Sequence, residues 1–208
     1  MSRRRVALLV LAALLAVGGV VLLVPPSGTR SLRVFDPDRL ADLETDMWRA
    51  YYKKEKLRLF SLLVSMLREQ YRLPYGKAIG VAFHWARAAA TFGDATSDYD
   101  RVLPDLQAGY ATLRDFLDAE WDNAEVARAE LAWWVARRVP AERSPENVGR
   151  LIAELYARIY HSPAARVATA GLLRAEAGQL RDQGGAAADW DAVARLLHDS
   201  YRSLHDAL

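Results

Sequence analysis

The sequence predicts an all-α protein, a six- to seven-helix bundle domain carried on a single N-terminal transmembrane helix. Three observations lead to this prediction. An uninterrupted apolar run covers Val6–Val24. Helix-start signals, in which a capping Asp or Ser precedes a proline, recur along the rest of the chain. Helical periodicity fills the intervals between them, and no segment of four or more residues alternates convincingly as a strand does.

The apolar run is long enough to cross a bilayer. At about 1.5 Å per residue, a helix over Val6–Val24 reaches roughly 28 Å, which is close to the thickness of the hydrocarbon layer. The alternative is a cleaved signal peptide, whose apolar region is usually about 7–15 residues long. Bulky residues at 22–24 also leave no small-residue cleavage site before Pro25. We therefore expect an uncleaved signal anchor.

Basic residues on the two sides of the run predict its orientation. Residues 1–5 include three consecutive arginines, Arg3–Arg5, whereas the basic residues beyond the run are dispersed. The positive-inside rule then favours a single-pass protein of the cell membrane, with residues 1–5 as a cytoplasmic stub and the domain extracytoplasmic. Residues 25–35 contain Pro, Gly and Ser, and we expect this short linker to lift the domain, residues 36–208, off the membrane.

Composition limits the possible functions of the domain. The net charge is +2, and no basic stretch marks a nucleic-acid binder, so we expect no nucleic-acid partner. The chain contains no cysteine, which excludes disulfides, thiol catalysis and zinc sites built on cysteine. About 180 residues follow the apolar run, which is enough chain for one domain with a good core.

The first helical segment begins at Asp36, a capping residue followed by a proline in the first helical position, and extends to Tyr71. The cationic patch Lys53–Lys56 within it predicts a bend or a short break. A second helix begins at Pro74 and ends at Gly93. Its predicted core face consists of four residues at helical spacing: Ile79, Phe83, Ala86 and Ala90.

Five further helices are predicted from their start and stop signals. The third covers Tyr99–Glu120, and Pro104 is tolerated near its first turn. The fourth is capped by Asp122 or Asn123 and ends at Pro140, and the fifth runs from Ser144-Pro145 to near Tyr160. The sixth runs from Ser162-Pro163 to before Gly184. The seventh is capped by Asp189 and runs nearly to the end of the chain. The short connections between them favour antiparallel neighbours in a bundle.

Two glutamates lie at helical spacing from aromatic residues. Glu44 has Trp48 one turn further along its helix, and Glu130 has Trp133 and Trp134 in the same relation. A carboxylate among aromatic rings can acquire a raised pKa and serve as an acid, a base or a metal ligand. The alternative, which we favour, is a structural carboxylate that accepts a hydrogen bond from Trp or Tyr, or pairs with an arginine.

Aromatic residues could also form the walls of a ligand pocket. Trp133, Trp134 and Arg137 share one face of the fourth helix with Glu130, and Trp48 is the corresponding residue on the first. Such a pocket would use one arginine to bind an anionic group. The alternative is bundle core with an arginine that extends to solvent, and this is the reading that we favour.

A metal site is the remaining chemical hypothesis. His84 lies between the apolar face of its helix and solvent, and Glu176 is a candidate inward carboxylate opposite the side that carries Arg174 and Arg181. Together with Glu44 and Glu130 they would form a carboxylate-rich metal site. No His stands three residues after any Glu, however, and no hydrolase, nucleotide-binding or zinc-protease motif is present. We therefore favour packing roles and expect no cofactor.

The sequence thus favours a non-enzymatic function. We expect a membrane-tethered extracytoplasmic interaction or scaffold domain, whose partners are the membrane, through residues 6–24, and another protein. The alternative is a helical-bundle enzyme, or a protein that binds a metal or cofactor, with the inward carboxylates and a histidine as its functional groups.

Overall fold

The computed structural model describes residues 18–19 and 22–208. All regular secondary structure in these residues is helical, which confirms the predicted all-α bundle. The helices are α2 (Pro37–Tyr52), α3 (Lys56–Tyr71), α4 (Tyr75–Asp94), α5 (Leu103–Leu117), α6 (Asn123–Arg138), α7 (Pro145–Tyr160), α8 (Ala168–Gly184) and α9 (Trp190–Ala207), with two 3-10 turns, η1 (Tyr99–Val102) and η2 (Gly185–Ala187).

The predicted transmembrane helix lies largely outside the described residues. Of the run Val6–Val24, only residues 18–19 and 22–24 are described. Among the residues that the structure describes, no helix combines the length and the apolar character needed to span a bilayer.

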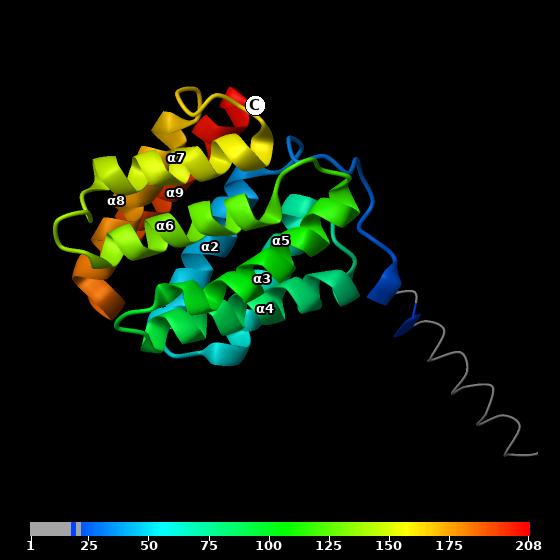
Figure 1. Cartoon of the computed structure of the whole chain (residues 1–208), viewed down its shortest axis with the longest axis horizontal. Helices are drawn as coiled ribbons and strands as arrows, with labels where there is room; N and C mark the ends of the chain where they lie inside the picture. Colours follow the sequence, from blue (N-terminus) through cyan, green and yellow to red (C-terminus); the bar gives the residue numbers. More distant parts are fainter. Residues whose placement is uncertain (1–17, 20–21) are drawn as a thin grey trace, which may run out of the picture.

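Helices α2 to α9 form a closed ring. Each helix packs against the next along the chain from α2 to α9, and α9 returns to pack against α2 (Figure 1). The largest fully buried side chains are leucines, among them Leu40 of α2, Leu113 of α5 and Leu197 of α9. Helices from both ends of the chain therefore contribute to one interior, where residues distant in sequence meet.

The predicted count of six or seven helices is wrong because the first segment is two helices. The break falls within the predicted cationic patch, after Tyr52. Lys54 adopts a left-handed backbone conformation with φ of 59°, and the Glu55 amide donates to the Ala50 carbonyl oxygen at 2.9 Å. This turn reverses the chain, so that α2 and α3 pack against each other instead of forming one long rod.

Four of the predicted helix starts carry the expected side-chain cap. Asp36 accepts hydrogen bonds from the amides of residues 38 and 39, and Asp122 accepts from those of residues 124 and 125. Ser144 and Asp189 each accept one from the amide three residues on. These bonds satisfy amide groups that have no partner within the first turn of a helix, which explains why these four start signals predict helices correctly.

The predicted start of the sixth helix is wrong. Ser162 and Pro163 precede a turn over residues 164–166, and α8 begins at Ala168. The Arg166 amide donates to the Pro163 carbonyl oxygen three residues back, which is the bond of a tight turn and not of an α-helix. The third predicted helix also differs, because it starts as the 3-10 turn η1 and ends at Leu117, before Asp118 in a left-handed conformation.

The predicted core face of the second helix is wrong. Ile79 and Phe83 are 41% and 56% exposed, and Ala90 is also exposed. The buried residues of α4 are instead Ala78, Val81, Ala82, Ala88 and Phe92. This helix has apolar residues on two faces, so its periodicity alone could not identify the side that packs against α3 and α5.

Helices α7 and α8 approach each other closely at two glycines. A Cβ atom placed on Gly149 would lie 2.7 Å from the Leu172 Cα, and one placed on Gly171 would meet the Gly149 carbonyl oxygen and the Ala153 amide. Any side chain at these positions would collide with backbone. The two glycines therefore set the distance between the helices.

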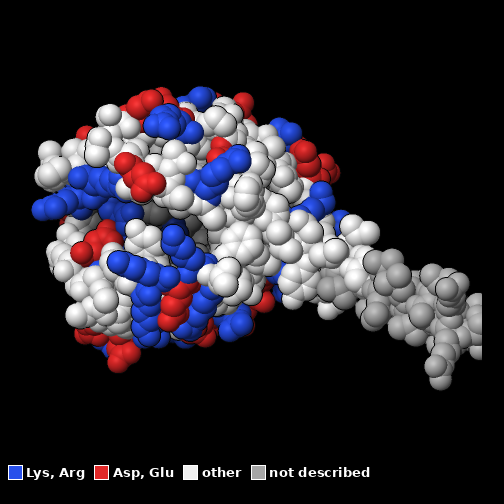
Figure 2. Space-filling view, turned by 90° about the horizontal axis from the view of Figure 1, so that it is seen from below, with Lys and Arg blue, Asp and Glu red and all other residues white. Residues whose placement is uncertain are grey.

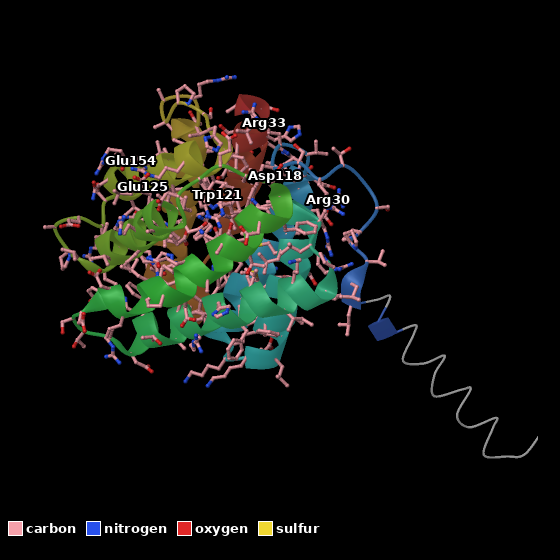
Figure 3. The ribbon with its side chains drawn as sticks, turned by 45° about the vertical axis from the view of Figure 1, so that its right-hand side comes forward. Arg30, Arg33, Asp118, Trp121, Glu125 and Glu154 are labelled. Carbon is pink, nitrogen blue, oxygen red and sulfur yellow. The ribbon has the colours of Figure 1, made fainter. Side chains whose placement is uncertain are left out.

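The linker packs against the domain in the structure. The Arg33 guanidinium donates to the carbonyl oxygens of Leu208 and Tyr160, at 2.6 and 3.2 Å, and Phe35 is buried. Arg30 lies over the Phe116 ring with its guanidinium carbon 4.8 Å from the centroid (Figure 3). These contacts join residues 30–35 to α5, α7 and the C-terminus. This part of the predicted linker therefore lies against the surface of the domain and does not extend away from it.

Candidate functional site: a polar interior and two clusters of arginines

The interior of the ring contains a charged pair. Glu44 of α2 is 2% exposed, and its carboxylate pairs with the guanidinium of Arg174 from α8. Arg174 Nη2 lies 2.6 Å from Oε1, and Nε lies 3.3 Å from Oε2, so the contact is bidentate. This geometry gives strong, directional charge-assisted hydrogen bonds. It satisfies the Glu44 carboxylate within the protein.

Tyr201 completes the surroundings of Glu44. Its hydroxyl donates to Glu44 Oε2 at 2.8 Å from α9. Burial, and after it the charge of Glu44, raises the pKa of Tyr201 well above its ordinary value. The phenol therefore keeps its proton and remains a hydrogen-bond donor. Glu44 thus accepts hydrogen bonds from two different helices, which is a structural role.

Glu130 is the second carboxylate that faces the interior. It accepts hydrogen bonds from the Tyr110 hydroxyl at 2.9 Å and from the Trp134 indole at 2.8 Å. Burial raises the pKa of Glu130, although the nearby positive charge of Arg174 and the two hydrogen bonds oppose this shift. The Glu130 carboxyl therefore holds its proton more tightly than an exposed glutamate does.

Buried tyrosines line the rest of this interior. The Gln70 amide donates to the Tyr160 hydroxyl at 2.8 Å. Burial raises the pKa of Tyr156 to about 12 and shifts the pKa of the other four in the same direction. All five phenols remain neutral near pH 7, and they come from four helices of the ring: Tyr71, Tyr110, Tyr156, Tyr160 and Tyr201.

The four residues of the predicted ligand pocket each contact other groups of this chain. Trp133 lies beside Arg174, whose guanidinium carbon is 5.2 Å from the indole centroid, and Trp134 donates to Glu130. Trp48 supports Arg181 in the same way, at 4.0 Å. The chain's own guanidinium groups therefore lie over the rings of Trp133 and Trp48, and Glu130 accepts the indole hydrogen bond of Trp134.

Arg137, the fourth residue of the predicted pocket, belongs to a cluster around Asp182. Arg137 Nη1 lies 3.0 Å from Asp182 Oδ2, while Arg181 and the Tyr52 hydroxyl both donate to Oδ1 at 2.9 Å. Burial, and after it the charge of Arg181, lowers the pKa of Arg137. Two guanidinium groups thus share one carboxylate between α2, α6 and α8.

The predicted metal ligands do not all lie together. Arg174 pairs with Glu44, and its charge also acts on Glu130, whereas His84 hydrogen-bonds to Asp105 at 2.8 Å, and Arg87 also pairs with that aspartate. Arg87, followed by His84, holds the pKa of Asp105 below its ordinary value. In residues 18–19 and 22–208, no three His, Asp or Glu side chains form a group that could hold a metal ion.

The sequence did not indicate which side of α8 faces inward. Arg174 and Arg181, on the charged side of this helix, point into the bundle, and Arg181 is only 8% exposed. Glu176, which the sequence predicted to be inward, is half-buried. No acidic residue lies three or four positions from Arg174 along α8, which agrees with a partner on another helix but does not identify Glu44.

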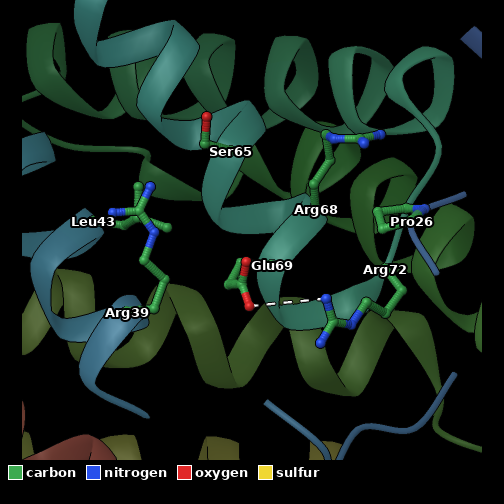
Figure 4. Close-up of a pocket in the computed structure, with 7 residues that line it drawn as sticks. All are labelled: Pro26, Arg39, Leu43, Ser65, Arg68, Glu69 and Arg72. Atoms are coloured by element: carbon green, nitrogen blue, oxygen red, sulfur yellow. Dashed lines mark ion pairs between the residues drawn. The ribbon is translucent and has the colours of Figure 1, made fainter. Parts of the chain in front are cut away.

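Pockets at the surface of the described residues include two that are lined by charged side chains. One, of about 210 Å³, lies between the start of the linker, α2 and α3, and Arg39, Arg68 and Arg72 line it together with Glu69 (Figure 4). The other, of about 350 Å³, lies between α6 and α7, and its charged residues are Glu125, Arg128, Glu154 and Arg158; Figure 3 labels the two glutamates. The first pocket is predominantly basic, and the second contains equal numbers of acidic and basic residues.

Comparison with known proteins gave no relative. No protein-family model matches the chain, and no curated protein or solved structure is significantly similar to it.

Proposed function

We propose that this chain is a non-enzymatic interaction domain that residues 6–24 tether to the cell membrane, with the N-terminus cytoplasmic and the domain extracytoplasmic. The apolar run and Arg3–Arg5 support the tether and its orientation. The partnered interior supports a structural role for the buried charges. Glu44 is fully engaged by Arg174 and Tyr201, so it is not poised as a free acid, base or ligand.

One observation favours an interaction domain most strongly, the exposed apolar face of α4. Tyr75, Ile79 and Phe83 lie one turn apart and are 39%, 41% and 56% exposed. Gly80 lies between them with no atom near the position that its Cβ would occupy. Because the opposite side of α4 packs into the core, this face is not needed for folding. Contiguous exposed apolar residues are typical of interaction surfaces.

The position of this face suggests what covers it. A Cβ atom placed on Gly76 would lie 3.2 Å from the Leu22 carbonyl oxygen, so the first turn of α4 is adjacent to the end of the proposed anchor. Residues 22–24 are themselves exposed and apolar. Figure 1 places α4 along the lower edge of the domain, and Figure 2 shows from below an uncharged area that continues toward the N-terminal end of the described chain.

We therefore propose that α4 receives an apolar helix of a partner membrane protein. Exposed glycines on a helix allow a second helix to approach closely, and a ridge of apolar side chains provides the buried area. The Arg68 and Arg87 guanidinium groups lie over the Tyr75 and Phe83 rings, with their central carbons 3.5 and 5.4 Å from the centroids. Arg87 pairs with Asp105, whereas Arg68 forms no salt bridge within the described residues. The edge of the surface near Tyr75 is therefore basic, which favours an acidic residue beside the partner's apolar stripe.

Photocrosslinking in intact membranes tests this proposal. A photoreactive amino acid at Phe83 should give an adduct with one discrete protein, and the same amino acid at the exposed Arg150 of α7 should not. An Ile79→Ser substitution should reduce the Phe83 adduct. Adducts with lipid alone, or equal labelling from Arg150, would contradict a protein partner at α4.

The raised pKa of Glu130 favours a second candidate function, a helical-bundle enzyme or a protein that binds a metal or cofactor. Metal analysis and an absorption spectrum of the purified chain distinguish it from the first. A stoichiometric metal or a chromophore that is lost in Glu130→Gln would favour this second function. We expect neither.

A further inference from the structure

The pocket between the start of the linker and helices α2 and α3 has an excess of positive charge. Arg39 of α2 and Arg68 and Arg72 of α3 line it, and Glu69 is its only acidic residue among the described part of the chain (Figure 4). Three guanidinium groups against one carboxylate leave two uncompensated positive charges. In residues 18–19 and 22–208, neither Arg39 nor Arg68 forms a salt bridge.

The single carboxylate does not neutralise the pocket. The nearest contact between Glu69 and Arg72 is 3.9 Å, from Oε1 to Nη1, which is too long for a hydrogen bond. Both side chains are about one quarter exposed, so solvent weakens their attraction. Within the described residues, Arg72 Nε is buried and has no hydrogen-bond acceptor. A buried donor without an acceptor is rare in proteins, and this one belongs to a residue that lines the pocket.

The pocket is also held in place before any ligand arrives. Arg68 donates from Nη1 to the Leu73 carbonyl oxygen at 3.0 Å, and its guanidinium rests on the Tyr75 ring. Arg72 ends α3 in a left-handed backbone conformation, and its amide donates to the Arg68 carbonyl oxygen at 3.1 Å. Arg68 and Arg72 thus belong to one ordered turn at the end of α3. Their side chains lose less conformational entropy when a ligand binds than freely moving side chains would.

We propose that this pocket binds a phosphate group. Arginine is well suited to phosphate because its planar donors match the oxygens, and three arginines balance a group with more than one negative charge. Pro26 lines the pocket and follows the apolar run by two residues. A phospholipid headgroup is therefore within reach if residues 6–24 span the bilayer, and a free phosphorylated molecule offers the same chemistry.

The α6–α7 pocket provides a matched control within the same protein. It is larger, but Glu125 and Glu154 there balance Arg128 and Arg158, so it has no excess charge. Arg128→Gln is the control variant. Like Arg39→Gln and Arg72→Gln, it replaces an arginine that lines an open surface pocket, but it does so in the pocket between α6 and α7. Arg39, Arg72 and Glu69 belong to the phosphate pocket alone, whereas Arg68 lies between this pocket and the α4 surface, so the variants that test phosphate binding leave Arg68 unchanged.

The test uses the full-length chain in a non-ionic maltoside detergent. Inorganic phosphate is titrated at constant ionic strength, and the melting temperature reports binding, because a ligand that binds the folded state raises it. Arg39→Gln and Arg72→Gln should each weaken the apparent phosphate affinity roughly tenfold, since each removes a charge-assisted hydrogen bond. Arg128→Gln should leave the affinity unchanged. Arg39 is exposed, so its variant is expected to fold normally.

Glu69→Gln provides a second variant with the opposite sign. It removes the one carboxylate that the described residues place in the pocket, and it should tighten phosphate binding roughly two- to fivefold. A merely structural role for Glu69 would not predict any gain. The second arm of the test is native mass spectrometry of the same detergent-solubilised chain with phosphatidylglycerol added, which counts the lipid molecules that remain bound.

Three outcomes are decisive. Retention of phosphatidylglycerol that is lost in Arg39→Gln and Arg72→Gln identifies a lipid headgroup as the source of the phosphate. Saturable inorganic phosphate binding without lipid retention identifies a free phosphorylated ligand. If neither ligand binds, or if Arg128→Gln weakens binding as much as Arg39→Gln does, the proposal is overturned.

Discussion

Arg174 of α8 pairs with Glu44 of α2 across the interior of the helical ring, although the two residues are 130 positions apart in the sequence. The contact joins helices that are not neighbours along the chain. Because both groups are largely buried, each is the other's main compensation for lost hydration. Substitutions at Glu44 and Arg174 therefore measure how much this buried pair contributes to the stability of the domain.

Glu44→Gln should destabilise the domain strongly. The substitution leaves the Arg174 guanidinium buried without a counter-charge, and breaking a buried pair in this way costs about 3–5 kcal/mol. Denaturant unfolding of residues 30–208 followed by circular dichroism measures the difference. The double variant Glu44→Gln/Arg174→Met should recover part of the loss, because it removes both charges. A Glu44→Gln domain as stable as wild type would contradict a structural role for this pair.

Glu130 should make the folded state less stable as the pH rises. Burial raises its folded pKa, so the folded protein binds this proton more tightly than the unfolded chain does. Stability is therefore lost as the pH increases from the ordinary glutamate pKa through the raised folded value. The glutamine side chain of the Glu130→Gln variant cannot ionise, so the variant lacks this loss of stability. The difference in melting temperature, variant minus wild type, should therefore increase steadily as the pH rises across that interval. A difference that stays constant with pH would show that the carboxyl is not perturbed.

The two faces of α4 should respond differently to truncation. Val81 is fully buried, so Val81→Ala should cost about 1.5–3 kcal/mol through lost burial and a small cavity. Phe83 is more than half exposed, so Phe83→Ala should change stability by no more than about 0.5 kcal/mol. Urea unfolding of both variants compares them directly. A larger loss of stability in Phe83→Ala than in Val81→Ala would indicate that the face with Phe83, which the sequence predicted, is the one that packs into the core.

Gly171→Ala should destabilise the domain although alanine favours helices. The new methyl group would collide with backbone of α7, so the two helices must separate. We expect a cost of about 1–3 kcal/mol, which is typical of overpacking. Gly80→Ala is the control, because its Cβ meets open space and the change should stabilise the helix by up to about 1 kcal/mol. If Gly171→Ala melted at a higher temperature than Gly80→Ala, the close contact between α7 and α8 at Gly171 would be refuted.

Local signals in the sequence identified much of the fold. Asp36 and Asp122 cap helices because their side chains bond to amides two or three residues away, and such bonds do not depend on the rest of the protein. The hydrogen bond from Trp134 to Glu130 is of the same kind, because residues four apart meet on one helix.

Interactions that depend on tertiary packing could not be predicted in this way. Nothing near Glu44 in the sequence indicates Arg174 or Tyr201, which approach it only when the ring closes. Helix α8 has no side-chain cap, so its start at Ala168 carried no signal. The basic pocket combines a linker residue with side chains from two helices, and only their packing brings its arginines together.

The intact mass of the protein that remains in carbonate-washed membranes shows whether residues 6–24 tether the domain. A chain tethered by residues 6–24 resists alkaline extraction, because about 19 apolar residues are buried in the bilayer. We predict that the protein stays in the membrane pellet with the mass of the uncleaved chain. A chain that is released into the supernatant and begins near residue 25 to 30 would show that the apolar run is a cleaved signal, and would contradict a membrane-tethered interaction domain.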